Sequence, residues 1–376
     1  MTDADRSVTN AKGQYRNRVY QFIYQRGQTC RQEISHSLGI SMPTVLQNVK
    51  ELICEGYICE LGRYASAGGR KAAILSPVSQ VRYALGISFS CNHIQFAMAD
   101  ALGDMLSFSR ERHAFSNTQQ YFARLEEYIA HFVMDSGVDP SRILGCGVSL
   151  PAIFDRTGEN ILTSRILGLT SVCCTAFTSH IPFNCVFINE SNANCIAEMK
   201  ALGNGLDNYV HVTVSDCLGG AIFIDGRLYQ GDTLRDAEFG HIRLHPGGKT
   251  CFCGQKGCSN SYLSTSILAQ CANGNLEAFF EGLKAGNAEF ERVWNTYLDD
   301  LALLLNNLRM AFDCHVILGG ELGYFIHPYL DCLHRRLADI NAFWMDDKYV
   351  KPCLMQQGAA PLGAALQVIQ QFIDGV

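Results

Sequence analysis

The stretch Glu238-Phe239-Gly240-His241, followed ten residues after the histidine by Cys251-Phe252-Cys253-Gly254 and then by Gly257-Cys258, decides the fold of this 376-residue chain. It puts one imidazole and three thiols in a glycine-rich loop, and these are the groups that hold zinc in closed tetrahedral sites. Glycine lets the backbone turn tightly enough to aim all four ligands inward. The stretch therefore predicts one structural zinc per chain, bound by His241, Cys251, Cys253 and Cys258.

The alternative is that these cysteines cluster by coincidence. The chain contains 17 cysteines, and a Cys-x-Cys pair can also be two buried thiols, which behave as small apolar side chains. Here the cysteines lie in a polar, glycine-rich stretch and not on an apolar face. That setting favours the zinc site.

The same spacing resembles the signature of the ROK family, which comprises repressors, open reading frames and sugar kinases. The resemblance covers nearly the whole chain, and the spacing of the zinc ligands is its most specific part. It implies an α/β, actin-like (ribonuclease-H-like) domain of two lobes, with ligand bound in the cleft between them. Because the family contains both enzymes and DNA-binding proteins, the remaining sequence must distinguish the two.

Composition and charge favour a DNA-binding head on an acidic body. The net charge is -6, yet residues 15–71 carry +4, and residues 72–376 therefore carry -10. A basic module attached to an acidic domain is typical of a DNA reader. No apolar run approaches the length of a membrane span, and the polar N-terminus has no signal-peptide core. An odd number of cysteines without a signal sequence indicates the reducing cytoplasm.

Residues 15–76 are expected to form a winged helix-turn-helix domain, preceded by a disordered segment, residues 1–14. Val19, Phe22 and Ile23 give a first helix an apolar stripe. Thr29 with Gln32 forms a capping box for a second helix. Ser41 is expected to cap a third helix, which two short strands, residues 57–61 and 70–75, follow.

The third helix is expected to lie in the major groove of DNA. Glutamine and asparagine can make paired hydrogen bonds to adenine, and threonine can contact phosphate or a thymine methyl group. In the wing, small residues next to Arg70-Lys71 can enter a narrow minor groove. The alternative is a module that packs against another protein. The predicted DNA-contacting residues are Pro43, Thr44, Gln47, Asn48, Lys50, Arg70 and Lys71.

Residues 77–376 alternate between apolar strands and amphipathic helices, as an α/β domain of two layered lobes requires. By resemblance this is the ROK domain, with a zinc loop at residues 238–260. Strands are expected at residues 83–89, 94–99, 143–148, 186–189, 209–214, 221–224 and 316–318. Helices are expected at residues 118–135, 191–202, 265–272 and 290–312.

The parts that a ROK kinase needs are altered. Family kinases carry Asp-x-Gly-Gly-Thr after the first strand, where this chain reads Ser88-Phe89-Ser90-Cys91-Asn92. Their second phosphate turn, Gly-Thr-Gly-x-Gly-Gly, reads Ser215-Asp216-Cys217-Leu218-Gly219-Gly220, and Asp216 would repel phosphate. The catalytic Asp of Asn-Asp-Ala-Asn is replaced by Glu190, whose longer side chain displaces the carboxylate. These changes predict that the chain is not an enzyme.

The sugar pocket is partly retained by resemblance, with Asn189, Glu190, Glu238 and His241 facing the cleft. His241 would then bind zinc through one ring nitrogen and face the ligand with the other. Three positions depart from the family pattern, namely Ala152, Ile166 and Asn260. Fewer polar anchors predict a modified or less polar sugar, or a lost effector.

Together these features predict a cytoplasmic regulator of carbohydrate-use genes, expected to act as a repressor. Its partners would be double-stranded operator DNA, a sugar or sugar derivative, and further copies of the chain in a homodimer or tetramer, with no membrane. Two alternatives remain open: a sugar kinase, and a regulator controlled by a protein partner.

Overall fold

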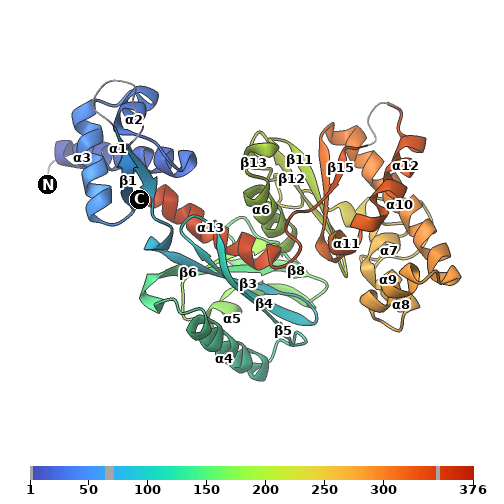
Figure 1. The fold of residues 1–376 in the computed structure, drawn as a ribbon. Helices are drawn as coiled ribbons and strands as arrows, with labels where there is room; N and C mark the ends of the chain where they lie inside the picture. The colour runs from blue at the N-terminus through green and yellow to red at the C-terminus, as the bar shows by residue number, and fades with distance from the viewer. Residues whose placement is uncertain (1–2, 64–71, 344–347) are drawn as a thin grey trace.

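The computed structural model describes residues 3–63, 72–343 and 348–376. Figure 1 shows a small N-terminal module (blue), a first lobe (cyan to green) with the red C-terminal helix lying against it, and a second lobe (yellow-green to orange-red). Within the described residues, no helix combines the length and the apolar character that crossing a bilayer requires.

The N-terminal module has the order of a winged helix-turn-helix, which confirms the predicted fold. Its three helices are α1 (Asp3–Arg26), α2 (Arg31–Leu38) and α3 (Met42–Cys54). The antiparallel strands β1 (Ile58–Arg63) and β2 (Ala73–Pro77) form the wing. Apolar side chains from every one of these elements meet in one core, which contains Val19, Tyr20, Ile23, Ile34, Val45, Val49, Leu52, Ile58 and Leu75.

Two local features of this module differ from expectation. Helix α1 begins at Asp3, inside the segment 1–14 that polar composition led us to expect as disordered, and a polar sequence does not exclude a helix. The predicted capping box is wrong, because Cys30 is the N-cap residue of α2 and makes no side-chain cap bond. Thr29 instead pairs with Leu75 of the wing through two main-chain hydrogen bonds, of 3.1 and 2.8 Å.

The first lobe contains a five-stranded sheet in the order β10-β6-β3-β4-β5. Strands β3 (Tyr83–Phe89), β4 (His93–Asp100) and β5 (Met105–Arg112) form an antiparallel meander. Strands β6 (Ile143–Leu150) and β10 (Cys185–Asn189) add to it in parallel. Accompanying elements are α4 (Gln119–Asp135), α5 (Thr175–Thr178) and the small sheet of β7 (Ile153–Phe154), β8 (Asn160–Ser164) and β9 (Leu169–Cys173).

The second lobe repeats this arrangement in the order β13-β12-β11-β14-β15. Strands β11 (Tyr209–Val214), β12 (Leu218–Ile224) and β13 (Arg227–Leu228) are antiparallel, and β14 (His315–Gly319) and β15 (Val350–Pro352) add in parallel. This duplication is the two-lobed actin-like fold that was predicted. The helices of this lobe are α7 (Asn260–Leu263), α8 (Thr265–Cys271), α9 (Leu276–Lys284), α10 (Ala288–Phe312), α11 (Gly320–Phe325) and α12 (Leu330–Ile340).

Two further helices connect the parts of the molecule. Helix α6 (Glu190–Leu202) follows β10, and α13 (Ala359–Gly375) returns from the second lobe to the first. Helix α13 lies so close to the first sheet that a Cβ atom on Gly86 would stand 1.8 Å from the carbonyl oxygen of Pro361. The far end of α13 reaches the N-terminal module (Figure 1), where the Phe372 ring lies 5.7 Å from that of Tyr57.

Short 3-10 turns complete the chain. They span Ser79–Val81, Pro140–Arg142, Gly203–Gly205, Phe239–His241 and His327–Tyr329. The turn at Phe239–His241 is the one that concerns function, because it opens the cysteine-rich loop.

Candidate functional site

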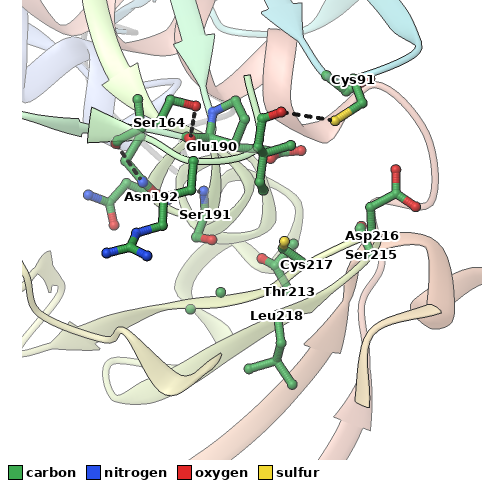
Figure 2. A pocket seen from close by; sticks show the side chains of 18 of the residues that line it. Cys91, Ser164, Glu190, Ser191, Asn192, Thr213, Ser215, Asp216, Cys217 and Leu218 are labelled. Carbon is green, nitrogen blue, oxygen red and sulfur yellow. Dashed lines mark hydrogen bonds between the residues drawn. The ribbon is translucent and has the colours of Figure 1, made fainter. Parts of the chain in front are cut away.

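A cavity of about 1580 Å³ opens between the two lobes. Figure 2 looks into it, with Cys91, Ser164 and Glu190 on one side and Thr213, Cys217 and Leu218 on the other. The four side chains that are expected to face a sugar all line this cavity. Two come from the first residue of α6 and its N-cap, and two come from the Phe239–His241 turn and its N-cap. These are Asn189, Glu190, Glu238 and His241.

Asn189 has a structural role as well as a place in the cavity. It is the N-cap residue of α6, and its Oδ1 accepts hydrogen bonds from the main-chain N–H groups of Ser191 and Asn192. Its Nδ2 donates to the carbonyl oxygen of Ala152 at 3.0 Å. These bonds fix the amide and leave one N–H hydrogen of Nδ2 for a ligand.

Glu190, the first residue of α6, lies in a strongly acidic part of the cavity. Burial raises the pKa of its carboxyl group to about 7, and the negative charges of Glu321 and Asp216 add to the effect. Burial also raises the pKa of Glu321, with Asp216 contributing. Like charges close together disfavour the ionised form of each group. A nucleotide phosphate placed here would add a further negative charge beside these carboxyl groups.

Glu238 and His241 face each other at the start of the cysteine-rich loop. Their Oε2 and Nε2 atoms are 3.9 Å apart. The other ring nitrogen of His241, Nδ1, lies 3.9 Å from the sulfur of Cys251. One side of the imidazole therefore faces the cysteines and the other side faces the carboxylate of Glu238.

The four predicted zinc ligands come together in one cluster. The ligand atoms of His241, Cys251, Cys253 and Cys258 all lie within 4.8 Å of one another, and the sulfurs of Cys253 and Cys258 are 3.7 Å apart. Zinc–sulfur bonds of about 2.3 Å in a tetrahedron separate neighbouring sulfurs by about 3.8 Å. The donor set and its spacing therefore fit zinc.

The backbone of the loop is built to bring these ligands together. The N–H of Cys251 donates to the carbonyl of Gln255, and the N–H of Gly254 donates back to the carbonyl of Cys251. Gly257 has a φ of +83°, and a Cβ there would stand 2.0 Å from the carbonyl oxygen of His245. Only glycine meets both conditions.

The glycines retained in the second kinase-like turn have a packing role. A Cβ on Gly219 would stand 2.3 Å from Oγ of Ser191, and one on Gly220 would stand 2.1 Å from the ring of Phe239. The two residues thus let α6 and the Phe239–His241 turn approach β12. Nearby Asn260, which departs from the family pattern, is buried, and its Oδ1 accepts the N–H of Leu218 at 2.7 Å. It supports β12 and does not face a sugar.

Three arginines that the sequence did not single out reach from the first lobe to the second. Nη1 of Arg165 donates to the carbonyl of Phe252 at 3.0 Å, in the middle of the metal loop. Nε of Arg156 donates to the carbonyl of Asp232 at 3.1 Å. Nη2 of Arg110 lies 3.9 Å from Oε1 of Glu321. These contacts depend on how the lobes meet, so no local sequence signal could have found them.

The predicted DNA-contacting face of α3 is partly present. Pro43, Gln47 and Lys50 are exposed, and Thr44 is partly exposed. Asn48 is a correction: its side chain is only 2% exposed, and its Nδ2 donates to the carbonyl of Thr44 at 2.8 Å.

Asn48 shares the buried face of α3 with Val45, Val49 and Leu52, which follow the helical repeat. It therefore does not belong to the exposed face. The predicted contacts Arg70 and Lys71 lie outside the described residues.

Comparison with known proteins agrees with this geometry. The model of the ROK family matches residues 84–371. The xylose repressor of Bacillus subtilis (strain 168) is 28% identical in an alignment of 368 positions that covers 92% of each chain. N-acetylmannosamine kinase of Yersinia pestis (strain Pestoides F) is 33% identical over 156 residues, which are 40% of this chain and 53% of the kinase.

Among solved structures, a ROK family transcriptional regulator that is a homolog of the E. coli MLC protein shares the fold over its full length. It superposes with a TM-score of 0.76 and 20% identity over 97% of both chains. By the match of the family model to most of its length, this chain belongs to the ROK family.

Proposed function

We propose that this chain is a DNA-binding transcriptional repressor of carbohydrate-use genes, and that a sugar bound in the interlobe cavity controls its affinity for operator DNA. The observation that carries the proposal is the combination, in one chain, of a winged helix-turn-helix and an interlobe cavity lined by Asn189, Glu190, Glu238 and His241. The similarity to a xylose repressor over 92% of both chains supports it. A homodimer would present two such modules to a palindromic operator.

A chain of contacts supports a route from the cavity to the DNA-binding module. Glu190 begins α6, and a Cβ on Gly363 of α13 would stand 1.8 Å from the carbonyl of Ala193 in α6. Helix α13 then contacts Tyr20 and Tyr57 of the module through Phe372. A sugar that bonds Glu190 and Glu238 together favours one lobe arrangement. It changes operator affinity only if it binds the two arrangements with different affinity.

We propose that zinc occupies the His241, Cys251, Cys253 and Cys258 cluster, where it would hold the loop and leave no coordination position for water. The loop in turn carries His241 and Phe252 to the cavity wall. The metal therefore supports the sugar site and takes no part in a reaction.

A sugar kinase is the second candidate, because the 33% identity to an N-acetylmannosamine kinase extends over 156 residues. Glu190 also keeps a carboxylate where the family kinases have their base. Against it stand the acidic wall of Asp216 and Glu321 and the packing roles of Gly219 and Gly220. Release of ADP from ATP with a panel of hexoses and N-acetylhexosamines would favour the kinase.

The proposed function is tested by fluorescence anisotropy with DNA fragments that the protein selects from its own genome. We expect binding to a few palindromic fragments, and at least one sugar in a panel of monosaccharides and disaccharides should shift the affinity. If the affinity for operator DNA is the same with and without every sugar, sugar control is wrong, and a regulator controlled by a protein partner becomes the favoured alternative. A lack of any selective DNA binding would overturn the repressor.

A further inference from the structure

The interlobe cavity is larger than a single sugar unit requires. Its volume of about 1580 Å³ exceeds the roughly 300–1,000 Å³ that is usual for small-molecule pockets. Asn189, Glu190, Glu238 and His241 account for one part of its lining. A second part, here called the second subsite, is defined by Arg110, Asp216, Glu321 and Tyr324, which line the same cavity. In a ROK kinase the turn that contains Asp216 would face phosphate, so the second subsite needs another occupant.

The second subsite carries charges of both signs on facing walls. Asp216 and Glu321 belong to the second lobe, and Arg110 reaches Glu321 from the first lobe at 3.9 Å. Carboxylates only accept hydrogen bonds and guanidinium groups only donate them, whereas a hydroxyl group does both. An anion is repelled by the two carboxylates, of which Arg110 offsets only one. A neutral polyhydroxylated group can donate hydrogen bonds to the carboxylates on one wall and accept them from Arg110 on the other.

Hydrogen bonds hold the acidic wall in place before any ligand arrives. Oγ1 of Thr265 donates to Oε2 of Glu321 at 3.0 Å, and the main-chain N–H of Glu321 donates to Oγ of Ser215 at 3.2 Å. Thr265 is buried at the start of α8, and Ser215 lies in the turn after β11. A bond from α8 to the carboxylate and a bond from the main chain of Glu321 to the turn after β11 therefore fix this residue, as a defined hydroxyl partner would require.

Tyr324 adds an aromatic surface. Its side chain is 50% exposed although it lines the cavity. The neighbouring Phe325 ring meets it edge to face at 4.9 Å and is itself stacked on the buried Phe280 at 4.4 Å. A tyrosine ring offers an apolar face and a polar edge. That combination matches a sugar ring, which has a face of C–H groups and a rim of hydroxyl groups.

We propose that the effector is a neutral oligosaccharide, with one sugar unit at Glu190 and Glu238 and the next unit at the second subsite, against Tyr324. This inference rests on the proposed sugar-controlled function and adds the class of sugar. The carboxylates of Asp216 and Glu321 accept hydroxyl groups of the second unit, and Arg110 donates to its oxygens.

The test is calorimetric titration of the full-length, zinc-loaded protein with matched series: xylose, xylobiose and xylotriose, and glucose, maltose and cellobiose. In at least one series we expect a disaccharide or trisaccharide to bind about tenfold more tightly than its monosaccharide, a difference of about 1.4 kcal/mol. Tyr324→Ala should remove most of this difference and leave the monosaccharide affinity unchanged. Tyr324→Phe, which keeps the ring, should behave as the parent chain.

Tyr229→Ala is the matched control, because Tyr229 is 49% exposed and does not line the cavity. Equal affinity for the monosaccharide and its oligosaccharides would overturn the inference and leave the sugar-controlled regulator standing. Equal weakening of both by Tyr324→Ala would overturn it too. Absence of binding by every sugar in both series would also overturn the inference, whereas sugar control itself is decided separately by the anisotropy test with the wider sugar panel.

Discussion

The side-chain amide of Asn17 donates a hydrogen bond of 2.8 Å to the main-chain carbonyl of Ile373, which joins the first helix of the chain to the last. Gln21 makes a second bond of this kind, to the carboxylate of Asp374 at 3.1 Å. Between them, the rings of Tyr20 and Phe372 meet at 6.3 Å. The DNA-binding module is therefore attached to α13 by polar and aromatic contacts together, and not by the chain connection alone.

This joint leads to a prediction about coupling. Asn17→Ala should leave operator affinity in the absence of sugar within about twofold, because Asn17 bonds Ile373 of α13 and does not belong to the exposed face of α3. The change in operator affinity on adding sugar should shrink, because α13 no longer holds α1 in a defined position. Anisotropy titrations with and without sugar measure both quantities. Gln25→Ala, at an exposed position of the same helix, is the control. An undiminished sugar response in Asn17→Ala would show that the contact between α1 and α13 does not transmit it.

The exposed face of α3 predicts two different effects on DNA binding. Lys50→Ala should weaken binding to all sequences alike and reduce the slope of log affinity against log salt by about 1. Gln47→Ala should cost about 1–3 kcal/mol at one base position and relax specificity there. Titrations at several salt concentrations against a set of mutated operators separate the two. A uniform loss for Gln47→Ala would show that it contacts phosphate and not a base.

Asn48 provides the contrast within the same helix. Because its side chain is buried and bonded to Thr44, Asn48→Ala should lower the melting temperature of the module and affect operator binding only through folding. If Asn48→Ala has normal stability but altered specificity at one base position of the operator, the burial of Asn48 would be contradicted.

The metal cluster predicts that one thiol controls the stability of the second lobe. Cys253→Ala should lower the zinc content from one equivalent toward zero and lower the melting temperature, because metal binding contributes folding free energy. Cys271→Ala, at an exposed cysteine outside the cluster, should change neither. Atomic emission for zinc and calorimetry for melting provide the readouts. Full zinc content with an unchanged melting temperature in Cys253→Ala would rule out the structural role.

The raised pKa of Glu190 predicts a pH-dependent stability. Burial together with Glu321 and Asp216 raises its pKa from 4.5 to about 7 in the folded protein. Folding therefore favours the protonated carboxyl, so the stability linked to this group is full below about pH 4.5 and is lost as the pH rises through 7. Glutamine does not titrate.

Glu190→Gln should accordingly have little effect on the melting temperature near pH 5 and should raise it near pH 8. Thermal melts across this range, compared with Glu281→Gln at an exposed position of α9, measure the difference. A melting-temperature shift that is the same at both pH values would contradict the raised pKa.

Much of the fold could be predicted from local patterns. Strands β3 and β11 have the bounds that their apolar runs predicted, residues 83–89 and 209–214. The metal ligands were found because their spacing lies within one loop. By contrast, local patterns do not predict helix α13. Its sequence contains Pro361 and Gly363, and it lacks a polar face over its buried length. Only its burial between the first sheet and α6 explains that composition.

The two errors in the module have different origins. Thr29 suits a cap locally, but its main chain pairs with Leu75 on the wing, a contact from outside the local segment. Asn48 is polar, yet its spacing from Val45 and Leu52 puts it on the buried face, so the helical repeat of the sequence already contained this signal. The interlobe contacts of Arg110, Arg156 and Arg165 resemble the case of Thr29, because they depend on segments that lie far apart in the sequence.

The most direct test of the central claim is to mix the purified protein with fragmented DNA from its own genome and to sequence what is retained. The double variant Gln47→Ala, Lys50→Ala serves as the control for the α3 face. We predict that the parent chain retains a few discrete palindromic sites near carbohydrate-use genes and that the double variant loses them. Retention of no fragment above bulk DNA, with folded protein and a full complement of zinc, would contradict the assignment as a DNA-binding repressor.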